Sequence, residues 1–186
     1  MYCVKSVTHY EELIKKSRFI GVIAPCLSEN AALLHIKQLY EQHPHATHIA
    51  FAYRIKTPEG FVSRFNDAGE PTGTAGKPIY QHLEGKQLIN VLVAVIRYFG
   101  GVKLGAGGLT RAYGNSARQV IEIAEIIEYV EFATVALNLD YKQMQMLEYQ
   151  LKKLDGEIIQ QDFAGQVKVV VSLPLVHLKT LQAMFS

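Results

Sequence analysis

The segment RYFGGVKLGAGGLTRAYG, residues 97–114, combines six glycines with three basic side chains. Because glycine has no Cβ, backbone N–H groups can approach a phosphate closely, and a helix N-terminus adds a potential that favours an anion. Arg97, Lys103 and Arg111 would add charge-assisted hydrogen bonds to the same anion. The residue types therefore predict an anion-binding segment. A second interpretation stays open, in which the glycines only let a tight turn pack against a sheet.

The spacing of these glycines departs from both common nucleotide-binding fingerprints. The phosphate loop of NTPases follows the pattern G-x-x-x-x-G-K-S/T, yet Ala106 stands where the second glycine would follow Gly101. The dinucleotide fingerprint G-x-G-x-x-G needs a third glycine where this chain has Thr110. ATP or NAD binding of the usual kind is therefore disfavoured, and no cofactor is expected.

A second segment of turn-forming residues, NDAGEPTGTAGKP, spans residues 66–78. Its two carboxylates, Asp67 and Glu70, have the chemistry of a general acid and base or of metal ligands. However, Asp and Thr are also standard turn formers, and the spacing shows no nucleophile–base pair. A structural turn is the favoured interpretation of this segment.

The histidines of HPHATH, residues 43–48, match the His-x-His-x-x-His spacing of some zinc hydrolases. Those sites carry an Asp before the third histidine, where this chain has Thr47, and no second cluster of ligands follows. A histidine at the end of a helix also interacts favourably with the helix dipole. We therefore expect no metal site.

Composition limits the class of protein. The 186 residues allow one large domain or two small ones, and 49% hydrophobic with 19% charged residues excludes a disordered chain. The longest apolar run, Val91 to Ile96, is far shorter than the ~20 residues of a membrane helix. Glu11 and Glu12 occur before any apolar core of a signal peptide. These features predict a soluble cytoplasmic protein without a membrane partner.

Charge is distributed unevenly along the chain. Residues 1–120 carry 14 Lys and Arg against 8 Asp and Glu, whereas residues 121–186 carry 5 against 9. A polyanion is therefore expected to bind the first part of the chain.

Periodicity predicts the elements that would position these segments. In the first part we expect strands at 17–25, 47–55 and 60–65, a helix at 28–43 with Ser28 as N-cap, and a short helical segment at 80–85. A central strand at 88–99, buried on both faces, and an amphipathic helix at 109–130 follow. The second part has the order β-α-β-β-α, with strands at 132–140, 156–163 and 166–174, helices at 141–154 and after Pro174, and a hairpin near Ala164 and Gly165. The predicted domains are residues 1–131 and 132–186.

Taken together, RFNDAGEPTGTAGKPI and VIRYFGGVKLGAGGLTRAY, with ATH…AYRI upstream, resemble the IMPACT/YigZ family over essentially the whole chain. The resemblance implies an α+β protein with two domains. The N-terminal β-α-β domain would be similar to domain IV of elongation factor G and to a domain of a small-subunit ribosomal protein. The C-terminal domain would be ferredoxin-like but without its last strand, which would leave a neighbouring strand unpaired. The family usually has a second acidic residue where this chain has Ala68, which weakens a metal role for that loop.

The resemblance also implies a link to translation. Eukaryotic relatives restrain the starvation-activated kinase that phosphorylates an initiation factor, but that role relies on an extra N-terminal module for which we expect no room here. Bacterial members are associated with binding of nucleic acid or ribosomes. The main prediction is therefore a regulator that binds RNA or the ribosome. Its expected phosphate contacts are basic residues and glycines: Arg64, Lys77, Arg97, Gly100, Gly101, Lys103, Gly105, Gly107, Gly108 and Arg111. Tyr98, Phe99 or Tyr113 would be available to stack on bases.

Two alternatives stay open. The protein could be an enzyme or binding protein for a small phosphorylated or anionic ligand held between segments 66–78 and 100–108, with Asp67 or Glu70 as general acid or base. It could instead bind a protein partner through an acidic helix face formed by Glu122, Glu125 and Glu128. The sequence leaves the oligomeric state open.

Overall fold

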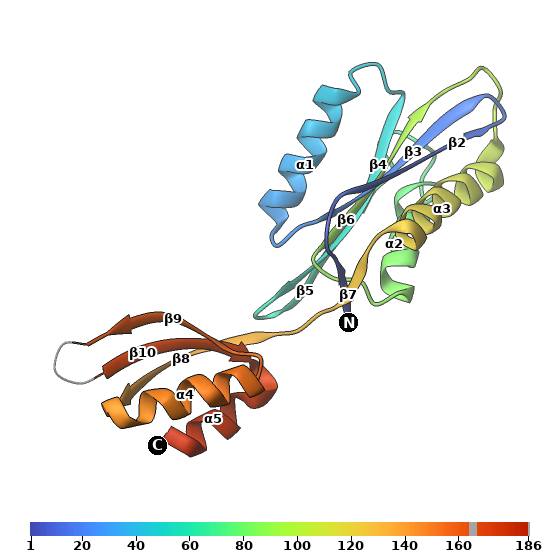
Figure 1. Ribbon diagram of the computed structural model, residues 1–186. Helices are drawn as coiled ribbons and strands as arrows, with labels where there is room; N and C mark the ends of the chain where they lie inside the picture. The colour runs from blue at the N-terminus through green and yellow to red at the C-terminus, as the bar shows by residue number, and fades with distance from the viewer. Residues whose placement is uncertain (164–166, 186) are drawn as a thin grey trace. The chain divides into compact units, whose positions relative to one another are not determined.

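The computed structural model describes residues 1–163 and 167–185, and it divides into two compact units, Met1–Tyr129 and Val130–Ser186 (Figure 1). Both units combine strands with helices. The predicted α+β class is therefore confirmed.

A five-stranded sheet forms the centre of the N-terminal unit. Its order is β2 (Thr8–Ile14), β3 (Ser17–Pro25), β6 (Val91–Tyr98), β4 (His48–Thr57) and β5 (Gly60–Asn66), and every neighbouring pair is antiparallel. β6 lies in the middle of the sheet, and all of its residues except Tyr98 are buried. The predicted central strand, buried on both faces, is confirmed with slightly narrower bounds.

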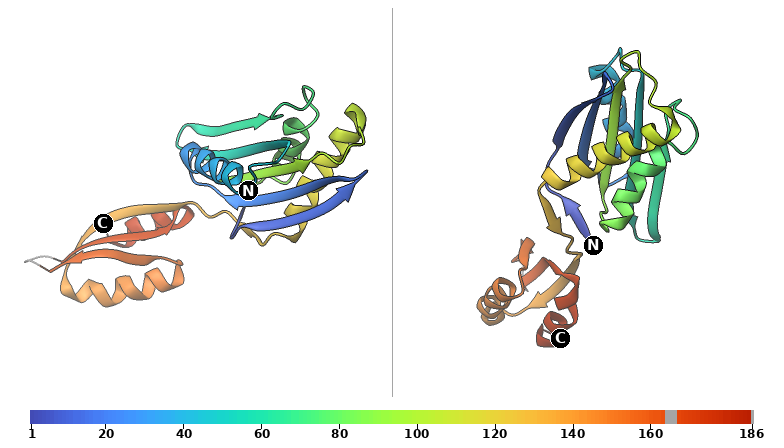
Figure 2. Two further views of the ribbon diagram at one scale, coloured as in Figure 1. Left: turned by 90° about the horizontal axis from the view of Figure 1, so that it is seen from above. Right: turned by 90° about the vertical axis from the view of Figure 1, so that its right-hand side faces the viewer.

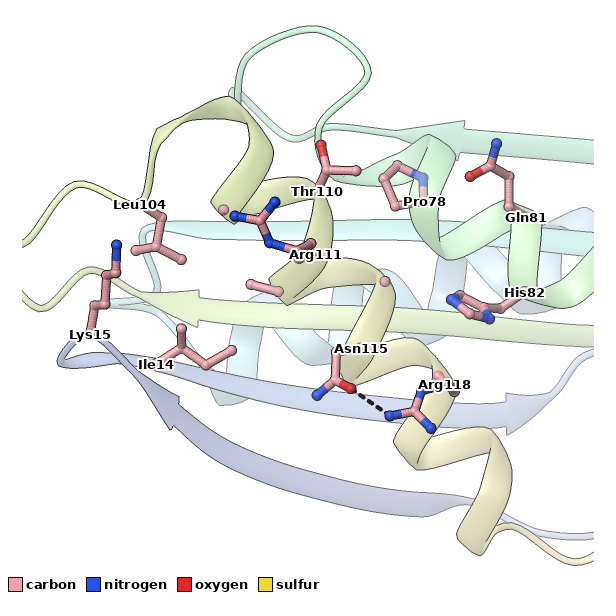
Figure 3. Close-up of a pocket in the computed structure, with 13 residues that line it drawn as sticks. Ile14, Lys15, Pro78, Gln81, His82, Leu104, Thr110, Arg111, Asn115 and Arg118 are labelled. Carbon is pink, nitrogen blue, oxygen red and sulfur yellow. Dashed lines mark hydrogen bonds between the residues drawn. The ribbon is translucent and has the colours of Figure 1, made fainter.

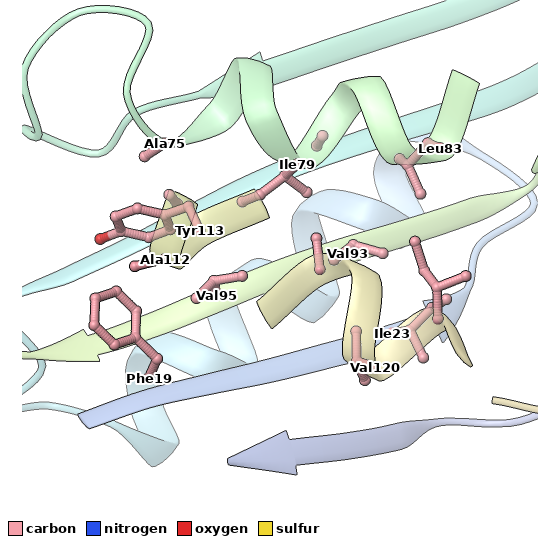
Figure 4. Close-up of a cluster of buried hydrophobic side chains, with 14 of the residues drawn as sticks. Phe19, Ile23, Ala75, Ile79, Leu83, Val93, Val95, Ala112, Tyr113 and Val120 are labelled. Carbon is pink, nitrogen blue, oxygen red and sulfur yellow. The ribbon is translucent and has the colours of Figure 1, made fainter. Parts of the chain in front are cut away.

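Helices cover both faces of this sheet because alternate residues of β6 point to opposite sides. Val93 and Val95 pack with α2 (Gly76–Gly85) and α3 (Gly105–Ile123), which lie side by side on one face (Figures 1, 2 and 4). Ala94 and Ile96 pack on the other face with α1 (Glu29–Gln42). α1 begins where predicted, since the Ser28 side chain accepts a hydrogen bond from the Ala31 N–H at 3.1 Å.

The helix predicted at 109–130 differs at both ends from the observed α3. It begins four residues earlier, at Gly105, and ends at Ile123. Beyond it the backbone is extended at Ala124, and β7 (Ile126–Glu128) pairs with β1 (Tyr2–Val4). The strands β1, β2 and β7 were not predicted. β1 and β7 are three residues long and pair with each other across more than a hundred residues of sequence, whereas β2 forms a hairpin with the neighbouring β3.

This earlier helix end removes the predicted acidic docking face. Glu125 and Glu128 lie beyond α3, and the Glu125 carboxylate accepts a hydrogen bond from Lys5 Nζ at 3.0 Å. Glu122, which is on the helix, accepts one from Arg118 at 3.1 Å. The prediction of a continuous acidic helix face for a protein partner is therefore wrong.

The C-terminal unit has the order β8 (Phe132–Leu139), α4 (Tyr141–Lys153), β9 (Glu157–Asp162), β10 (Val167–Pro174), a 3-10 turn (Leu175–His177) and α5 (Leu178–Phe185). Its strands pair antiparallel in the order β8-β10-β9, over a core that includes Leu147, Leu151 and Leu181. The predicted ferredoxin-like β-α-β-β-α order is confirmed. Within residues 130–163 and 167–185 the sheet has three strands, so β8 forms an edge. The predicted hairpin at Ala164 and Gly165 lies outside the described residues.

Candidate nucleic-acid interface

The glycine-rich segment 97–114 is divided among three elements. Arg97 and Tyr98 end β6, residues 99–104 form a loop, and α3 begins at Gly105. The prediction that the loop continues to residue 108 is wrong, because Gly105, Gly107 and Gly108 belong to the first turns of α3. Burial of Leu109 and Tyr113 against the sheet stabilises this glycine-rich start despite its low helix propensity.

Steric needs account for three of the glycines. A Cβ at Gly100 would overlap the backbone of Lys16 at the tip of the β2–β3 hairpin. Gly101 and Gly105 have φ angles of 89° and 73°, in the left-handed region that favours glycine. The interpretation that glycines permit a tight turn therefore applies to these positions.

The N-terminus of α3 lacks the usual features that satisfy its free amides. Its N-cap is Leu104, no side chain of the described residues caps it, and its first turn contains no acidic residue. The neighbouring residues Lys103, Gly105 and Ala106 are exposed. The first N–H groups of a helix have no partner within the helix, so this end carries a positive potential toward solvent.

The two predicted segments lie next to each other around a hollow of ≈ 400 Å³. Segment 66–78 contributes Glu70 and Pro71, while the loop and the start of α3 contribute Lys103, Leu104 and Gly105. The ring of Phe99 also lines the hollow and is 48% exposed. The structure therefore brings together one exposed cation, one exposed aromatic ring and a helix N-terminus.

Arg97 faces the same hollow but is committed to a buried cluster. Its Nη1 donates to Glu70 Oε1 at 2.6 Å, and the Tyr113 hydroxyl donates to the same oxygen at 2.7 Å. Arg97 is 5% exposed and Tyr113 is fully buried, and burial together with the Glu70 contact raises the pKa of Tyr113 above its ordinary value. The predictions that Arg97 binds phosphate and that Tyr113 stacks on a base are contradicted by this burial.

Asp67 and Glu70 both serve the fold. Asp67 accepts hydrogen bonds from the N–H groups of Gly73, Ala75 and Gly76 at 2.9–3.0 Å, at the start of α2. Burial alone would raise the pKa of Asp67, but these N–H bonds outweigh it and hold the pKa below its ordinary value. With Glu70 bound by Arg97 and Tyr113, neither carboxylate is free to act as a general acid or base. The described residues also contain no group of three or more His, Cys, Asp or Glu side chains placed to bind a metal.

The histidines of segment 43–48 make separate structural contacts. His43 is the C-cap of α1, and its Nδ1 lies 2.7 Å from the Tyr98 hydroxyl. His48 donates from Nδ1 to the Ala68 carbonyl at 2.8 Å, and its Nε2 lies 3.7 Å from Glu70. Tyr98 is half-buried through its contact with His43, so Phe99 is the more exposed of the two neighbouring rings.

The remaining predicted cations differ in position. Lys77 on α2 and Arg111 on α3 are exposed on the face that these helices share. Arg64 pairs with Tyr53 in the sheet register, and its Nε lies 3.4 Å from Glu29 of α1. Because Tyr53 packs with the core on the α1 side, its register partner Arg64 lies on that same face, away from the cations near α2 and α3.

Sequence reasoning missed a second hollow of ≈ 660 Å³ on the α2–α3 face (Figure 3). Besides Arg111, its basic lining residues are Lys15, His82 and Arg118. The sequence contained one signal for this hollow: Arg111, Asn115 and Arg118 are spaced so that they lie on one stripe of α3. The nearness of Lys15 and His82 depends on the tertiary structure.

The fold and the site define a two-unit α+β protein with a basic face over two adjacent helices. Residues 15–121 match the family described as the Impact N-terminal domain. The chain is 36% identical to an IMPACT family member of Haemophilus influenzae, over 98% of this chain and 87% of the relative, and 36% identical to the IMPACT family member YigZ of Escherichia coli, over 90% and 82%. A crystal structure of a hypothetical protein superposes with a TM-score of 0.73 at 32% identity, covering 98% of this chain and 89% of that one.

This chain therefore belongs to the IMPACT family, as the resemblance predicted. Among the described helices, none has the length and apolar character needed to cross a membrane.

Proposed function

We propose that this protein is a translation-associated regulator that binds RNA, free or in the ribosome, through the start of α3. One observation carries the proposal: Lys103 and Arg111 are exposed beside a helix N-terminus that has neither a capping side chain nor a first-turn carboxylate. Cations and free amides together favour phosphate groups. Membership of the IMPACT family supplies the connection to translation.

The exposed ring of Phe99 supports RNA as the polyanion. Single-stranded RNA presents unpaired bases that stack on aromatic side chains, whereas its phosphates bind nearby cations. Phe99 and Lys103 line the same hollow, so one nucleotide can contact both. Arg97, Tyr113 and Arg64 are left out of the proposed contact set because of their burial or position.

A salt titration of RNA binding tests the proposal. Each phosphate contact on a single strand adds about 0.7 to the slope of log K against log salt. We expect Lys103→Gln to lower that slope by about this amount. Lys37→Gln, on α1 at the opposite face, is the matched control and should leave the slope unchanged. Absence of RNA binding by the unaltered protein at low salt would contradict the proposal.

A second candidate function is binding of a small phosphorylated compound in the ≈ 400 Å³ hollow, which lies between the two predicted segments. Since Asp67 and Glu70 are both committed to the fold, this candidate is a binding function without an assigned acid or base. A thermal-shift screen separates the two candidates, because a ligand at 100 times its Kd stabilises the fold by ~2.7 kcal/mol. Stabilisation by a sugar phosphate in the absence of RNA binding would favour the second candidate.

A further inference from the structure

The larger hollow, which we call the basic groove, is formed by three elements that are distant in sequence. Lys15 comes from the β2–β3 hairpin, His82 from α2, and Arg111 and Arg118 from α3 (Figure 3). Gly108 and Gly114 of α3 also line it, and they add no side chain to its floor. A volume of ≈ 660 Å³ is in the range of sites that hold small organic ligands.

The charge in the basic groove is of one sign. Within residues 1–163 and 167–185, no carboxylate lines it. Arg118 is partly neutralised, because it donates to Glu122 at 3.1 Å and to Asn115 Oδ1 at 2.9 Å. Lys15 and Arg111 are exposed, and in the described part of the chain neither has an acidic residue at ion-pair distance. These two cations are therefore available to a ligand.

The pKa of His82, which lines the groove, is affected by the same positive charges. Burial lowers its pKa, and the positive charges of Arg118 and Lys86 lower it further, while Glu122 acts in the opposite direction. An anion bound in the groove would offset these cations and raise the pKa of His82. The imidazole is thus a natural probe for occupancy.

The hairpin tip presents Lys15 in an unusual backbone conformation. Ile14 pairs with Ser17, so Lys15 and Lys16 form a two-residue turn, and their φ angles are 45° and 67°. Turns of this kind strongly prefer Asn and Gly, because both central residues have positive φ. The backbone preference of such a turn therefore does not explain the two lysines. Lys15 does, however, line the basic groove beside the turn.

We infer that the basic groove binds one phosphorylated nucleotide unit, with its phosphate between Lys15 and Arg111. The apolar side chains of Ile14, Leu104 and Pro78 offer a surface for the base, and the side-chain amide of Gln81 can hydrogen-bond its edge. The amide of Asn115 is already engaged, because it donates to Glu12 and accepts from Arg118. Arg111 belongs to both surfaces, whereas Lys15, Gln81 and His82 lie beyond the contacts of the proposed function. Where RNA supplies the nucleotide, the inference rests on that function.

The test measures RNA affinity and free-nucleotide affinity separately. Anisotropy with a labelled single strand of roughly 12 nucleotides reports RNA, and NMR of the His82 imidazole during titration with AMP reports the free nucleotide. The groove variants are Lys15→Asn, which suits the same backbone conformation, and Arg111→Gln. Lys16→Asn is the matched control, since it makes the same charge change in the same turn but does not line the groove.

Each groove variant should weaken RNA binding about eightfold in ~50 mM salt, the effect of losing one phosphate contact. AMP should shift the His82 resonance in the unaltered protein and in Lys16→Asn, and much less in Lys15→Asn. If the unaltered protein binds RNA and Lys15→Asn binds it as Lys16→Asn does, the inference is overturned, while the proposed function stands as long as Lys103→Gln lowers the salt slope. If RNA does not bind but AMP shifts His82 in a Lys15-dependent manner, the proposed function fails and the groove is a site for free nucleotides.

Discussion

Arg97 and Arg111 belong to the same glycine-rich segment but have opposite environments. Arg97 ends the central strand, is 5% exposed and donates to Glu70 at 2.6 Å. Arg111 lies on the outer face of α3, exposed and beside Lys15 in the basic groove. The comparison teaches that a basic residue near glycines is a candidate ligand contact only where the fold has not already paired it with a buried carboxylate.

The largest expected effect on stability comes from a variant at the buried Arg97–Glu70 pair. Glu70→Gln removes the charge that neutralises Arg97, and an uncompensated buried charge costs about 3–5 kcal/mol. We expect the free energy of unfolding, measured in urea, to fall by that amount. Arg111→Gln, on the exposed side, should change it by no more than about 0.5 kcal/mol. Equal stability of the two variants would show that the Glu70 cluster does not have a structural role.

Next in size is a contrast between two glycines. Gly100→Ala places a Cβ against the backbone of Lys16 and should destabilise the protein by about 3 kcal/mol. Gly114→Ala meets His82 and Pro78 only at 3.6 and 3.7 Å, in ordinary contact, and should stabilise α3 by up to about 1 kcal/mol. Thermal unfolding of both variants measures the difference. A loss of stability in Gly114→Ala would mean that its backbone approach to α2 is tighter than observed.

Asp67→Asn tests the carboxylate that orders segment 66–78. Loss of charge-assisted bonds to backbone amides should cost about 2 kcal/mol at neutral pH. Because the folded pKa of Asp67 is lowered, its contribution is present above the pKa of the unfolded chain and is lost as pH falls through the folded value. The variant should therefore lose part of its acid sensitivity, as followed by Tm against pH. Glu59→Gln, an exposed carboxylate, serves as control and should leave the profile unchanged.

The smallest effect concerns the basic groove itself. The pKa of His82 is lowered by burial and neighbouring cations, so the unfolded chain binds a proton more readily than the folded protein. Stability should therefore decrease as pH falls from about 7 to 5, and His82→Gln should reduce that decrease. The pKa of His43 is also lowered, so His43 still contributes part of the decrease in stability in the His82→Gln variant. An identical slope in His82→Gln would show that the groove does not depress this pKa.

Much of the fold could be predicted from local patterns. Ser28 marked the start of α1, a continuous apolar run marked β6, and the order β-α-β-β-α of the C-terminal unit followed from periodicity and turn residues. The exposure of Lys103 and Arg111 was also anticipated. Such features depend on residues within a few positions of each other, so the sequence reports them directly.

The start of α3 could not be predicted from local sequence patterns. Three glycines at 105, 107 and 108 predict a loop by propensity, yet tertiary packing of Leu109 and Tyr113 makes them helical. At the other end, pairing of Ile126–Glu128 with Tyr2–Val4 replaced the last predicted turns. In both places packing with distant residues outweighed local preference.

By itself the sequence determined the α+β class, the order of most elements, membership of the IMPACT family and an excess of basic residues in the first part of the chain. Only the tertiary structure decided which of those basic residues are available. It brought Glu70 to Arg97 and Lys15 to Arg111, over separations that periodicity does not report. The physical reason is that a charge is neutralised or exposed by neighbours in space, and the folding of the sheet and helices selects those neighbours.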